Sequence, residues 1–440
     1  MTPGRAPLAV ELYGRHVADL IDAGHGSTAL QYTAEAVADP AGSRLSLSLP
    51  VRSDAYPGAG VASRWVRSLL PEGRALEWAV QAFGVPEDDR FGLIAALGAD
   101  VAGAVRVLSG PSEDVTGSYE VLEPAELAEL VRRAPEHGLG LDRSRGVRLS
   151  LAGLQDKVLL HQLGGDYCLP LNGAPSSLVV KPEPSPRTDG VDVTGLATNE
   201  LFCLTLARNC GLPAAEATVA RFGERPALVV TRYDRILRAN GLERVHQEDL
   251  LGAMGMDPWL KYEAPHIQRS LPAGGFADPT AVTSTPGPAL RDMSAFLAGY
   301  IGLANILPFL QAVTFNVAIG NADCHARNYS LLLPRTGDVE LAPLYDLICT
   351  RLYPELDADA AQRVNGRWEL DDISVDDLLA EATGWGLPSG VAETWVRATL
   401  GALTENLERA VGECVDRGGD PAVAAAVAHL VSGRLALLAA

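Results

Sequence analysis

The spacing of apolar residues first predicts a small α+β unit at the start of the chain. Short runs alternate between apolar and polar residues between Gly and Pro, which is typical of strands, and longer runs then take helical spacing. The predicted strands are residues 8–14 and 44–49, and the predicted helices are residues 61–83 and 91–97. A polar, turn-rich stretch at 110–119 predicts a boundary, so we place the first unit over residues 1–110.

The rest of the chain divides into a strand-rich and a helical part. A helix is expected over 124–133, and a strand-rich lobe over 145–235 contains one helix at 196–209. The strands expected in this lobe are residues 147–149, 158–162, 178–181, 217–222 and 227–233. From about residue 240 the pattern is mainly helical, interrupted by a Gly/Pro-rich loop at 271–288 and ending in Ala/Leu-rich helices over 391–440. This predicts a helical lobe over residues 236–440.

Composition and length place the chain among globular proteins. Its 440 residues, 47% hydrophobic and 21% charged, favour two or three compact units. We expect no membrane span, because no stretch of about 20 residues is apolar and free of charge. The N-terminus has one Arg and no long apolar region behind it, so no secretory signal is expected.

Charge and cysteine content narrow the partners and the compartment. A formal net charge of −19 disfavours direct nucleic-acid binding, although a basic partner could bring the chain to DNA. None of the six cysteines forms a CxxC pair, so neither a zinc knuckle nor a redox dithiol is indicated. Sparse cysteines in a long chain fit the reducing cytoplasm.

The candidate chemistry begins at Asp323 and Asn328. They are separated by four residues, the spacing of the protein-kinase catalytic loop, in which the Asp accepts the substrate hydroxyl proton and the Asn binds magnesium. Both groups must lie on one short loop, because the base has to reach the nucleophile while the amide oxygen reaches the metal. Taken alone, the spacing fits an ordinary polar turn better than a catalytic loop.

A second acidic residue strengthens this interpretation. Apolar runs at 330–333 and 339–341 on either side of a Thr-Gly-Asp turn predict a hairpin, and Asp346 follows it. Kinases hold magnesium with an Asp in this place, and one carboxylate, one amide and the ATP phosphates suffice as ligands. The alternative for Asp346 is a helix cap.

Two upstream segments complete the order of elements in a kinase. Residues 150–157 lie between two apolar strands, where a loop covers the phosphates in kinases, although one Gly in place of three also fits a plain hairpin turn. An apolar strand ends at Lys181, which would hold the α- and β-phosphates, and Glu200 on the following helix could pair with it. Each match alone is weak, but the complete order is hard to reach by chance.

With these motifs in view, the chain resembles the HipA-type toxins, the serine/threonine kinase half of a bacterial toxin–antitoxin pair. The resemblance extends over most of the chain. Besides the segments above, it rests on residues 47–50, 69–73, 97–105, 199–203, 232–235, 246–249 and 261–263. It implies an α+β fold with a bilobal protein-kinase-like core, a strand-rich N-lobe, a helical C-lobe and a small N-terminal α+β subdomain.

The resemblance also implies roles for individual residues. Asp323 would be the catalytic base, assisted by Lys181, and Asn328 and Asp346 would hold Mg²⁺. Contacts to ATP would come from Ser150, Ala152, Gly153, Leu154, Gln155, Asp156, Lys157, Lys181, Thr231, Tyr233, His325, Asn328 and Asp346. Ser150 would be autophosphorylated, and its phosphate would place a charge of about −1.5 to −2 beside the ATP phosphates and switch the kinase off. Without the resemblance, Ser150 is only a strand-end residue.

The partners implied are a protein substrate, expected to be an aminoacyl-tRNA synthetase, and a helix-turn-helix antitoxin that contacts residues 1–110 and binds DNA. Phosphorylation of the target would arrest growth.

Three departures from the family pattern stand out: Thr231 in place of Glu, Arg327 in place of Lys, and Cys324 beside His325. Two such ligands do not make a zinc site. The alternatives are a small-molecule kinase of related fold and a catalytically degenerate co-repressor.

Overall fold

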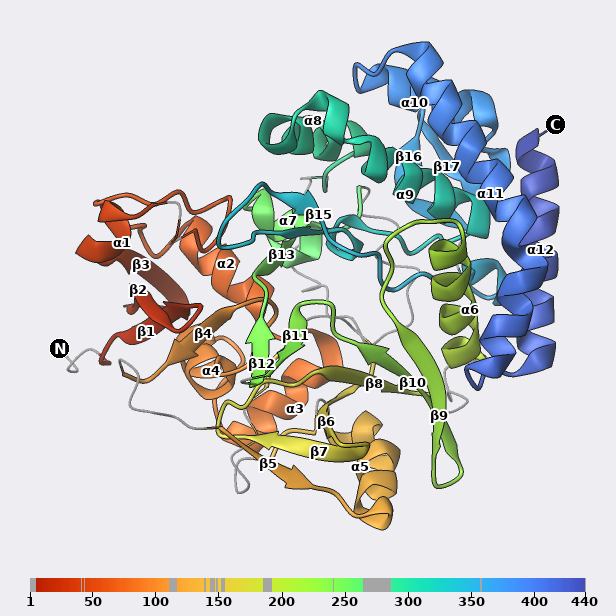
Figure 1. The fold of residues 1–440 in the computed structure, drawn as a ribbon. Helices are drawn as coiled ribbons and strands as arrows, with labels where there is room; N and C mark the ends of the chain where they lie inside the picture. The colour runs from red at the N-terminus through yellow and green to blue at the C-terminus, as the bar shows by residue number, and fades with distance from the viewer. Residues whose placement is uncertain are drawn as a thin grey trace.

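The computed structural model shows a chain built from three groups of elements around a central cavity (Figure 1). The structure describes residues 5–40, 42, 44–110, 117–137, 140–142, 147, 149–151, 155–184, 192–239, 241–263, 286–356 and 358–439. Four predicted features fall partly outside these residues: the connector at 111–116, the strand over 147–149 at residue 148, the phosphate loop at 152–154 and the Gly/Pro-rich loop at 271–285.

The first group, the N-terminal unit, is a four-stranded antiparallel sheet with four helices. Its strands are β1 (Leu8–Leu12), β2 (Arg15–Gly24), β3 (Ser27–Tyr32) and β4 (Val105–Leu108), in the order β3-β2-β1-β4. Its helices are α1 (Ala34–Ala38), α2 (Val61–Leu69), α3 (Gly73–Phe83) and α4 (Arg90–Leu97). The predicted helix over 61–83 is interrupted because Pro71 forces the preceding Leu70 into extended backbone (φ −85°, ψ 153°).

The strand predicted at 44–49 is wrong. Leu45, Leu47 and Leu49 are buried, so the alternation reflects burial in the core, but among the residues that the structure describes no strand pairs with this stretch. Its backbone is satisfied by distant side chains instead. The Leu47 N–H donates to the Glu248 carboxylate at 2.7 Å, and the His246 ring donates to the Leu45 carbonyl at 2.9 Å. Alternating burial therefore does not require a sheet when side chains supply the hydrogen bonds.

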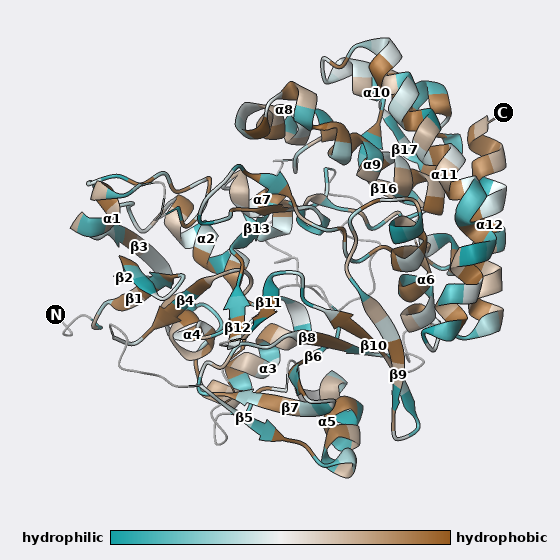
Figure 2. Ribbon diagram, viewed as in Figure 1, coloured by the Kyte–Doolittle hydropathy of each residue, from teal (hydrophilic) through white to brown (hydrophobic). Residues whose placement is uncertain are grey.

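The second group, the strand-rich lobe, is a six-stranded sheet with two helices. Its strands are β5 (Ser118–Val121), β6 (Val158–Leu163), β7 (Asp166–Leu171), β8 (Leu178–Pro182), β9 (Ala217–Phe222) and β10 (Arg225–Thr231), in the order β5-β7-β6-β8-β10-β9. Its helices are α5 (Pro124–His137) and α6 (Leu196–Asn209). The predicted connector thus ends earlier than expected, because β5 begins at Ser118. In Figure 2 the central strands and α6 are largely hydrophobic, which fits their burial between layers.

The third group, the helical lobe, contains the remaining elements. Its α-helices are α7 (Leu250–Ala253), α8 (Leu290–Ile301), α9 (Leu307–Ile319), α10 (Val375–Gly384), α11 (Ser389–Asp416) and α12 (Pro421–Ala439). Its strands are β11 (Arg235–Arg238), β12 (Gly241–Arg244), β13 (Gln247–Asp249), β14 (Ser330–Leu332), β15 (Glu340–Leu341), β16 (Asp359–Val364) and β17 (Arg367–Glu369). The predicted hairpin is confirmed as β14 and β15, and β14 also pairs with β13 in a small three-stranded sheet at the cavity.

One helix in the described part of the chain, α12, is long and apolar enough to cross a membrane, with a mean hydropathy of 1.8. The pair α8 and α9 passes the same test only as a span bent by 114°. Helix α12 packs on α6, α9 and α11, and its buried Arg434 donates to the Ile373 carbonyl at 3.0 Å. These contacts favour a helix packed on protein, and the absence of a membrane span stays a prediction.

A buried charge cluster joins the N-terminal unit to the strand-rich lobe. Asp100, which follows α4, accepts hydrogen bonds from Arg235 and Arg244 at 2.8 Å and from the Ser176 hydroxyl at 2.7 Å. Asp234 accepts from Arg235 and from Arg232 at 2.8 Å. Burial alone would raise the pKa of Asp100, but the guanidinium groups hold it well below its usual range. The cluster therefore anchors the segment after β10, which lines the central cavity.

Candidate active site

The loop with Asp323 follows α9 and is shaped by its own hydrogen bonds. Helix α9 ends at Gly320 in the left-handed conformation (φ 71°), which Gly adopts without strain. The Asn321 side chain then donates to the Asn316 side chain at 2.8 Å. The Thr350 hydroxyl accepts from the Ala322 N–H at 3.0 Å and donates to the Gly320 carbonyl at 2.8 Å. The loop is thereby held at both ends of its first turn.

Asp323 lies on this loop, half-buried, with its carboxylate engaged by one hydroxyl. The Tyr262 hydroxyl donates to Asp323 Oδ1 at 2.5 Å. Burial raises the pKa of Asp323, while the Lys261 ammonium and the Tyr262 hydrogen bond act in the opposite direction. A carboxylate with a raised pKa is suited to accept a proton from a hydroxyl, which is the task of a general base.

Asn328 is oriented by the same loop. Its side-chain amide group donates to the Asp323 carbonyl at 2.9 Å, and its backbone N–H donates to the His325 carbonyl at 2.8 Å. With the NH₂ group engaged, the amide oxygen remains as an acceptor at the cavity that Asn328 lines.

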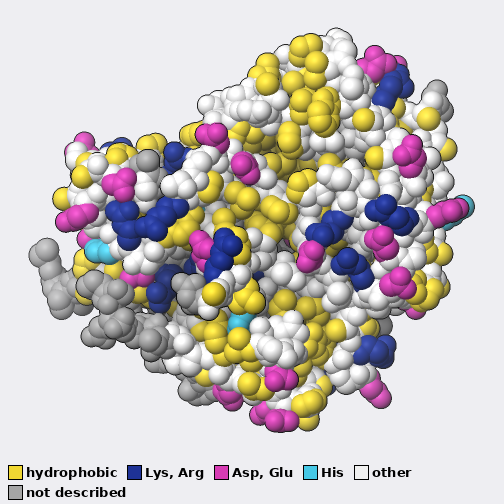
Figure 3. Space-filling model, viewed as in Figure 1, with side chains coloured by type: hydrophobic (Ala, Val, Ile, Leu, Met, Phe, Trp, Pro, Cys, Tyr) yellow, Lys and Arg dark blue, Asp and Glu magenta, His cyan; other side chains and the backbone are white. Residues whose placement is uncertain are grey.

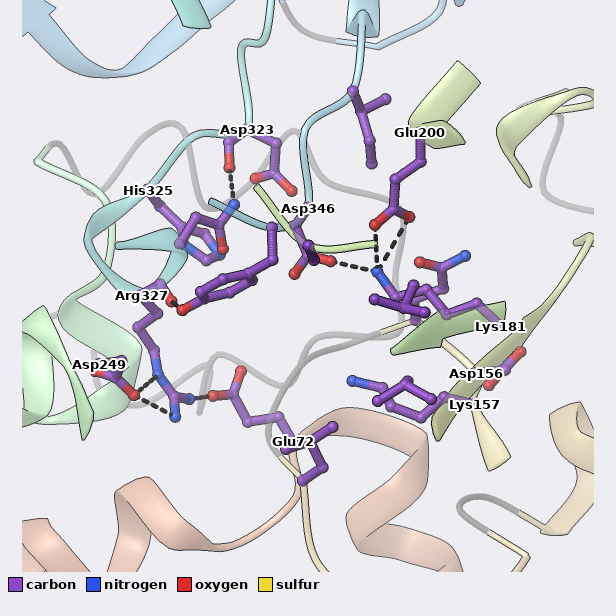
Figure 4. Close-up of a pocket in the computed structure, with 18 of the residues that line it drawn as sticks. Glu72, Asp156, Lys157, Lys181, Glu200, Asp249, Asp323, His325, Arg327 and Asp346 are labelled. Carbon is purple, nitrogen blue, oxygen red and sulfur yellow. Dashed lines mark hydrogen bonds and ion pairs between the residues drawn. The ribbon is translucent and has the colours of Figure 1, made fainter. Parts of the chain in front are cut away.

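Lys181 connects the two remaining acidic groups across the cavity. Its ammonium donates to both oxygens of Glu200, at 2.8 and 3.0 Å, and also forms an ion pair with Asp346 (Figure 4). The predicted pair of Lys181 and Glu200 is therefore confirmed as a contact. Burial raises the pKa of Asp346, but the ammonium groups of Lys181 and Lys157 bring it below its usual value. Asp346 adopts φ 50°, an uncommon backbone conformation that residues at functional sites often retain.

These side chains share one cavity of about 720 Å³, within the range of small-molecule sites. The predicted site residues that line it are Gln155, Asp156, Lys157, Lys181, Thr231, Tyr233, Asp323, His325, Asn328 and Asp346. Ser150 is fully buried and donates to the Leu69 carbonyl at 2.5 Å, so its hydroxyl points to the N-terminal unit. Ala152, Gly153 and Leu154 lie outside the described residues.

Sequence reasoning missed the part of the wall that comes from the N-terminal unit. The junction of α2 and α3 lines the cavity with Ser68, Leu69, Glu72 and Arg74. Glu72 forms an ion pair with Arg327 of the catalytic loop, and Arg327 also donates to Asp249 at 3.0 Å (Figure 4). The one available signal was the Leu-Leu-Pro-Glu-Gly stretch at 69–73, to which no role was given.

The site offers few protein ligands for a metal ion. In the described parts of the chain, no group of three or more His, Cys, Asp or Glu residues is placed to hold one. Asn328 and Asp346 are a pair of hard oxygen donors at the cavity, which fits Mg²⁺, because Mg²⁺ takes one or two protein ligands together with substrate phosphates and water.

A strand-rich lobe and a helical lobe around such a cavity form the architecture of the protein-kinase class of phosphotransferases. The family model described as the HipA-like C-terminal domain matches residues 149–411, and the model described as the HipA N-terminal domain matches residues 8–108. The chain therefore belongs to the HipA family of serine/threonine protein kinases. The predicted resemblance and fold class are thus confirmed, including the small N-terminal sheet subdomain.

Individual relatives agree over nearly the whole chain. The kinase candidate Y4mE of Sinorhizobium fredii is 32% identical over 92% of this chain and 91% of its own length. The serine/threonine-protein kinase toxin HipA of Shewanella oneidensis is 26% identical over 91% of this chain and 88% of its own. The solved complex of Shewanella oneidensis HipA with HipB and operator DNA matches with a TM-score of 0.78 and 25% identity, over 98% of this chain and 96% of that chain.

Proposed function

We propose that this kinase transfers the γ-phosphate of ATP to a Ser or Thr hydroxyl of a cellular protein, with Asp323 as the base. The observation that carries the proposal is the convergence of Asp323, Asn328, Asp346 and the pair of Lys181 and Glu200 on one cavity. Such a site acts by positioning and by electrostatic stabilisation, because the protein contributes little covalent chemistry to phosphoryl transfer.

The roles of the cavity residues follow from their places. Asp323 takes the hydroxyl proton as the acceptor oxygen attacks phosphorus, and Tyr262 orients the carboxylate. Lys181, held by Glu200, neutralises the α- and β-phosphates, and Lys157 approaches the same region (Figure 4). Mg²⁺, held by Asn328 and Asp346, would neutralise charge between the β- and γ-phosphates.

Adenine would lie against the segment that follows β10. Thr231 and Tyr233 line the cavity there. The Thr231 N–H donates to the Glu216 carbonyl at 2.8 Å, and the Arg232 N–H donates to the Ser177 carbonyl at 2.9 Å. Since these two amides are engaged within the protein, adenine would be read by the remaining backbone groups of this segment.

The regulatory and biological parts of the proposal rest on the family. By resemblance, the target is an aminoacyl-tRNA synthetase, its phosphorylation arrests growth in the cytoplasm, and phosphorylation of Ser150 switches the kinase off. Because the Ser150 hydroxyl is buried against Leu69, its modification would require residues 150 and 69 to separate. We assign nucleotide binding to residues 145–235 and catalysis to residues 236–440.

The proposed partner is a helix-turn-helix antitoxin that contacts residues 1–110 and supplies DNA affinity. Two observations support this division. The net charge of −19 gives the chain no overall attraction to DNA, and basic side chains are interspersed with acidic ones on the face in Figure 3. The solved relative is itself a complex with HipB and operator DNA.

The test is phosphate transfer from γ-labelled ATP to proteins of a cell lysate by the wild type, by Asp323→Asn and by Glu393→Gln, a variant in an exposed helix pair. We expect Asp323→Asn to lose at least about 100-fold of the transfer rate and Glu393→Gln to match the wild type. Equal labelling by Asp323→Asn would refute the assignment of the base. Label found only on a metabolite would instead indicate a small-molecule kinase.

A further inference from the structure

The few lysines of this chain all lie at one place in the structure. The sequence contains 36 Lys and Arg residues, of which three are lysines: Lys157, Lys181 and Lys261. All three line the cavity of the active site. Lysine is a compact point charge with rotatable donors, whereas arginine is a broad, planar fork, so the two are not equivalent near a phosphate. The cavity is therefore the place where this chain uses ammonium groups, and Lys261 is the one to which no role has been assigned.

Lys261 is fixed with respect to the catalytic loop. Its carbonyl accepts a hydrogen bond from the Ala326 N–H at 3.1 Å and from the Gln362 side chain at 2.8 Å. Two residues further on, the Glu263 N–H donates to the Ala361 carbonyl at 3.0 Å, and the Glu263 carboxylate accepts from the Arg363 N–H at 2.8 Å. The segment 261–263 is thus held by β16 and by the loop that carries Asp323.

The ammonium of Lys261 faces the acidic side of the cavity. Burial lowers its pKa, and the carboxylates of Asp323, Asp346 and Asp249 act in the opposite direction. Its contact with Glu72 is 3.5 Å long, compared with 2.8 Å between Lys181 and Glu200. Lys261 is therefore held less tightly by its carboxylate partner than Lys181 is. It lies on the side of the cavity that carries Asp323, the proposed base.

Phosphoryl transfer needs a cation in this place. Negative charge is spread over the oxygens of the transferring group, and fixed Lys, Arg or Mg²⁺ groups stabilise it. The other side chains near Asp323 do not meet this need. Arg327 is engaged by Glu72, Asp249 and the Ser68 carbonyl. Burial and the nearby Lys261 keep the pKa of His325 well below its usual value, which disfavours the charged imidazolium.

We propose that Lys261 is a catalytic residue that donates a hydrogen bond to the γ-phosphoryl group during its transfer. The inference rests on the proposed function and adds a residue to it. In the step, the acceptor oxygen forms a bond to the γ-phosphorus while the bond from that phosphorus to the bridging oxygen breaks. The electron pair of the broken bond stays on the bridging oxygen, which leaves as part of ADP. The hydroxyl proton moves to Asp323, and Lys261 keeps its proton throughout.

The first test is lysine footprinting of the intact wild-type protein. An acetylating reagent is applied with Mg²⁺ alone, with Mg²⁺ and ADP, or with Mg²⁺ and a non-hydrolysable ATP analogue, and modification of each lysine is measured by mass spectrometry. We expect the ATP analogue to slow acetylation of Lys261 at least about fivefold and ADP to leave it unchanged, while both nucleotides protect Lys181. Equal reactivity of Lys261 with ADP and with the analogue would overturn the proposal.

The second test compares Lys261→Met and Lys261→Arg. We expect Lys261→Met to lose about 100- to 1000-fold in kcat, as when one transition-state donor is removed, while the dissociation constant for ADP changes less than threefold. Lys261→Arg, which keeps the charge, should recover at least tenfold over Met. A Lys261→Met enzyme within threefold of the wild-type kcat contradicts the proposal.

The two tests also separate this inference from the proposed function. If Asp323→Asn keeps full activity, the base assignment fails while the footprint still decides whether Lys261 meets the γ-phosphate. If Lys261→Met does not fold, as shown by its circular dichroism and ADP binding, the footprint of the wild-type protein decides instead.

Discussion

Replacing Asp100 by Asn removes one of two negative charges from a buried cluster that holds three arginines. Asp100 is fully buried, and its carboxylate contacts Arg235 and Arg244 at 2.8 Å and Arg232 at 3.6 Å. Asp234 alone would then face all three guanidinium groups. The substitution keeps the shape of the side chain, so its effect reports the lost charge.

The expected loss of unfolding free energy is about 3 to 5 kcal/mol, which is typical when one partner of a buried ion pair is removed. Two cluster atoms, Arg235 Nε and Arg244 Nε, already lack a hydrogen-bond partner in the described structure. The cluster therefore has few groups left that could replace the contacts of the lost carboxylate. The Asn side chain also replaces an acceptor oxygen by a donor that faces guanidinium N–H groups. Those groups would remain buried and unpaired.

The assay is urea denaturation of the Asp100→Asn variant beside Glu393→Gln. The control has the same chemistry, because Arg397 contacts Glu393 at 2.8 Å, but both side chains are more than half exposed. Its expected cost is about 0.3 to 0.5 kcal/mol. Hydrogen exchange at the Ser176 amide, which donates to Asp100 at 2.9 Å, should accelerate in Asp100→Asn alone. If Asp100→Asn and Glu393→Gln lose unfolding free energy by amounts that agree within about 1 kcal/mol, the prediction is refuted. Burial would then make no difference to the cost of removing a paired charge.

Three further predictions concern pH, nucleotide binding and the core. Burial lowers the pKa of His246 from 6.5 to about 4, so as the pH falls the unfolded chain binds the proton before the folded chain does. The free energy of unfolding should therefore fall by about 2 kcal/mol between pH 7 and pH 5. A His246→Gln variant whose denaturation shows the same fall would contradict this. Glu200→Gln should raise the ATP dissociation constant about tenfold, or about 1.4 kcal/mol, because Lys181 loses the carboxylate to which it donates two hydrogen bonds. An unchanged nucleotide titration would count against this prediction. Phe315 in α9 is fully buried, and Phe315→Ala should lower the free energy of unfolding by about 3 to 5 kcal/mol. The exposed Leu437→Ala should lower it by less than about 0.5 kcal/mol. Similar urea midpoints for the two variants would disprove the placement of the core.

Local patterns predicted those elements whose reasons are local. The helix over 196–209 and the strand over 217–222 have the predicted bounds. Just after the helix, Gly211 takes the left-handed conformation (φ 78°), a local stop signal that the sequence shows directly. The pair of Lys181 and Glu200 was accessible for a similar reason, since it joins a strand to the next helix along the chain, 19 residues further on. In each case the information lies within a few tens of residues.

Long-range contacts were out of reach of such patterns. The stretch at 44–49 looks like a strand until His246 and Glu248, some 200 residues away, are seen to satisfy its backbone. Glu72 likewise carries no local mark of a role, because its partner Arg327 lies about 250 residues further along the chain. Such contacts depend on tertiary structure, which residue spacing along one sequence does not encode.

The contact of Glu72 with Arg327 changes how the two parts of the chain relate. The family matches cover residues 8–108 and 149–411 separately, which suggests independent modules. The structure joins them at the active site, because Glu72 and Asp249 from different groups of elements hold the guanidinium of Arg327 on the catalytic loop. Without the N-terminal unit, this buried cation would keep one carboxylate partner of two, and the cavity would lose the wall formed by the junction of α2 and α3. The N-terminal unit is therefore part of the wall of the candidate active site, in addition to being the proposed surface for a partner.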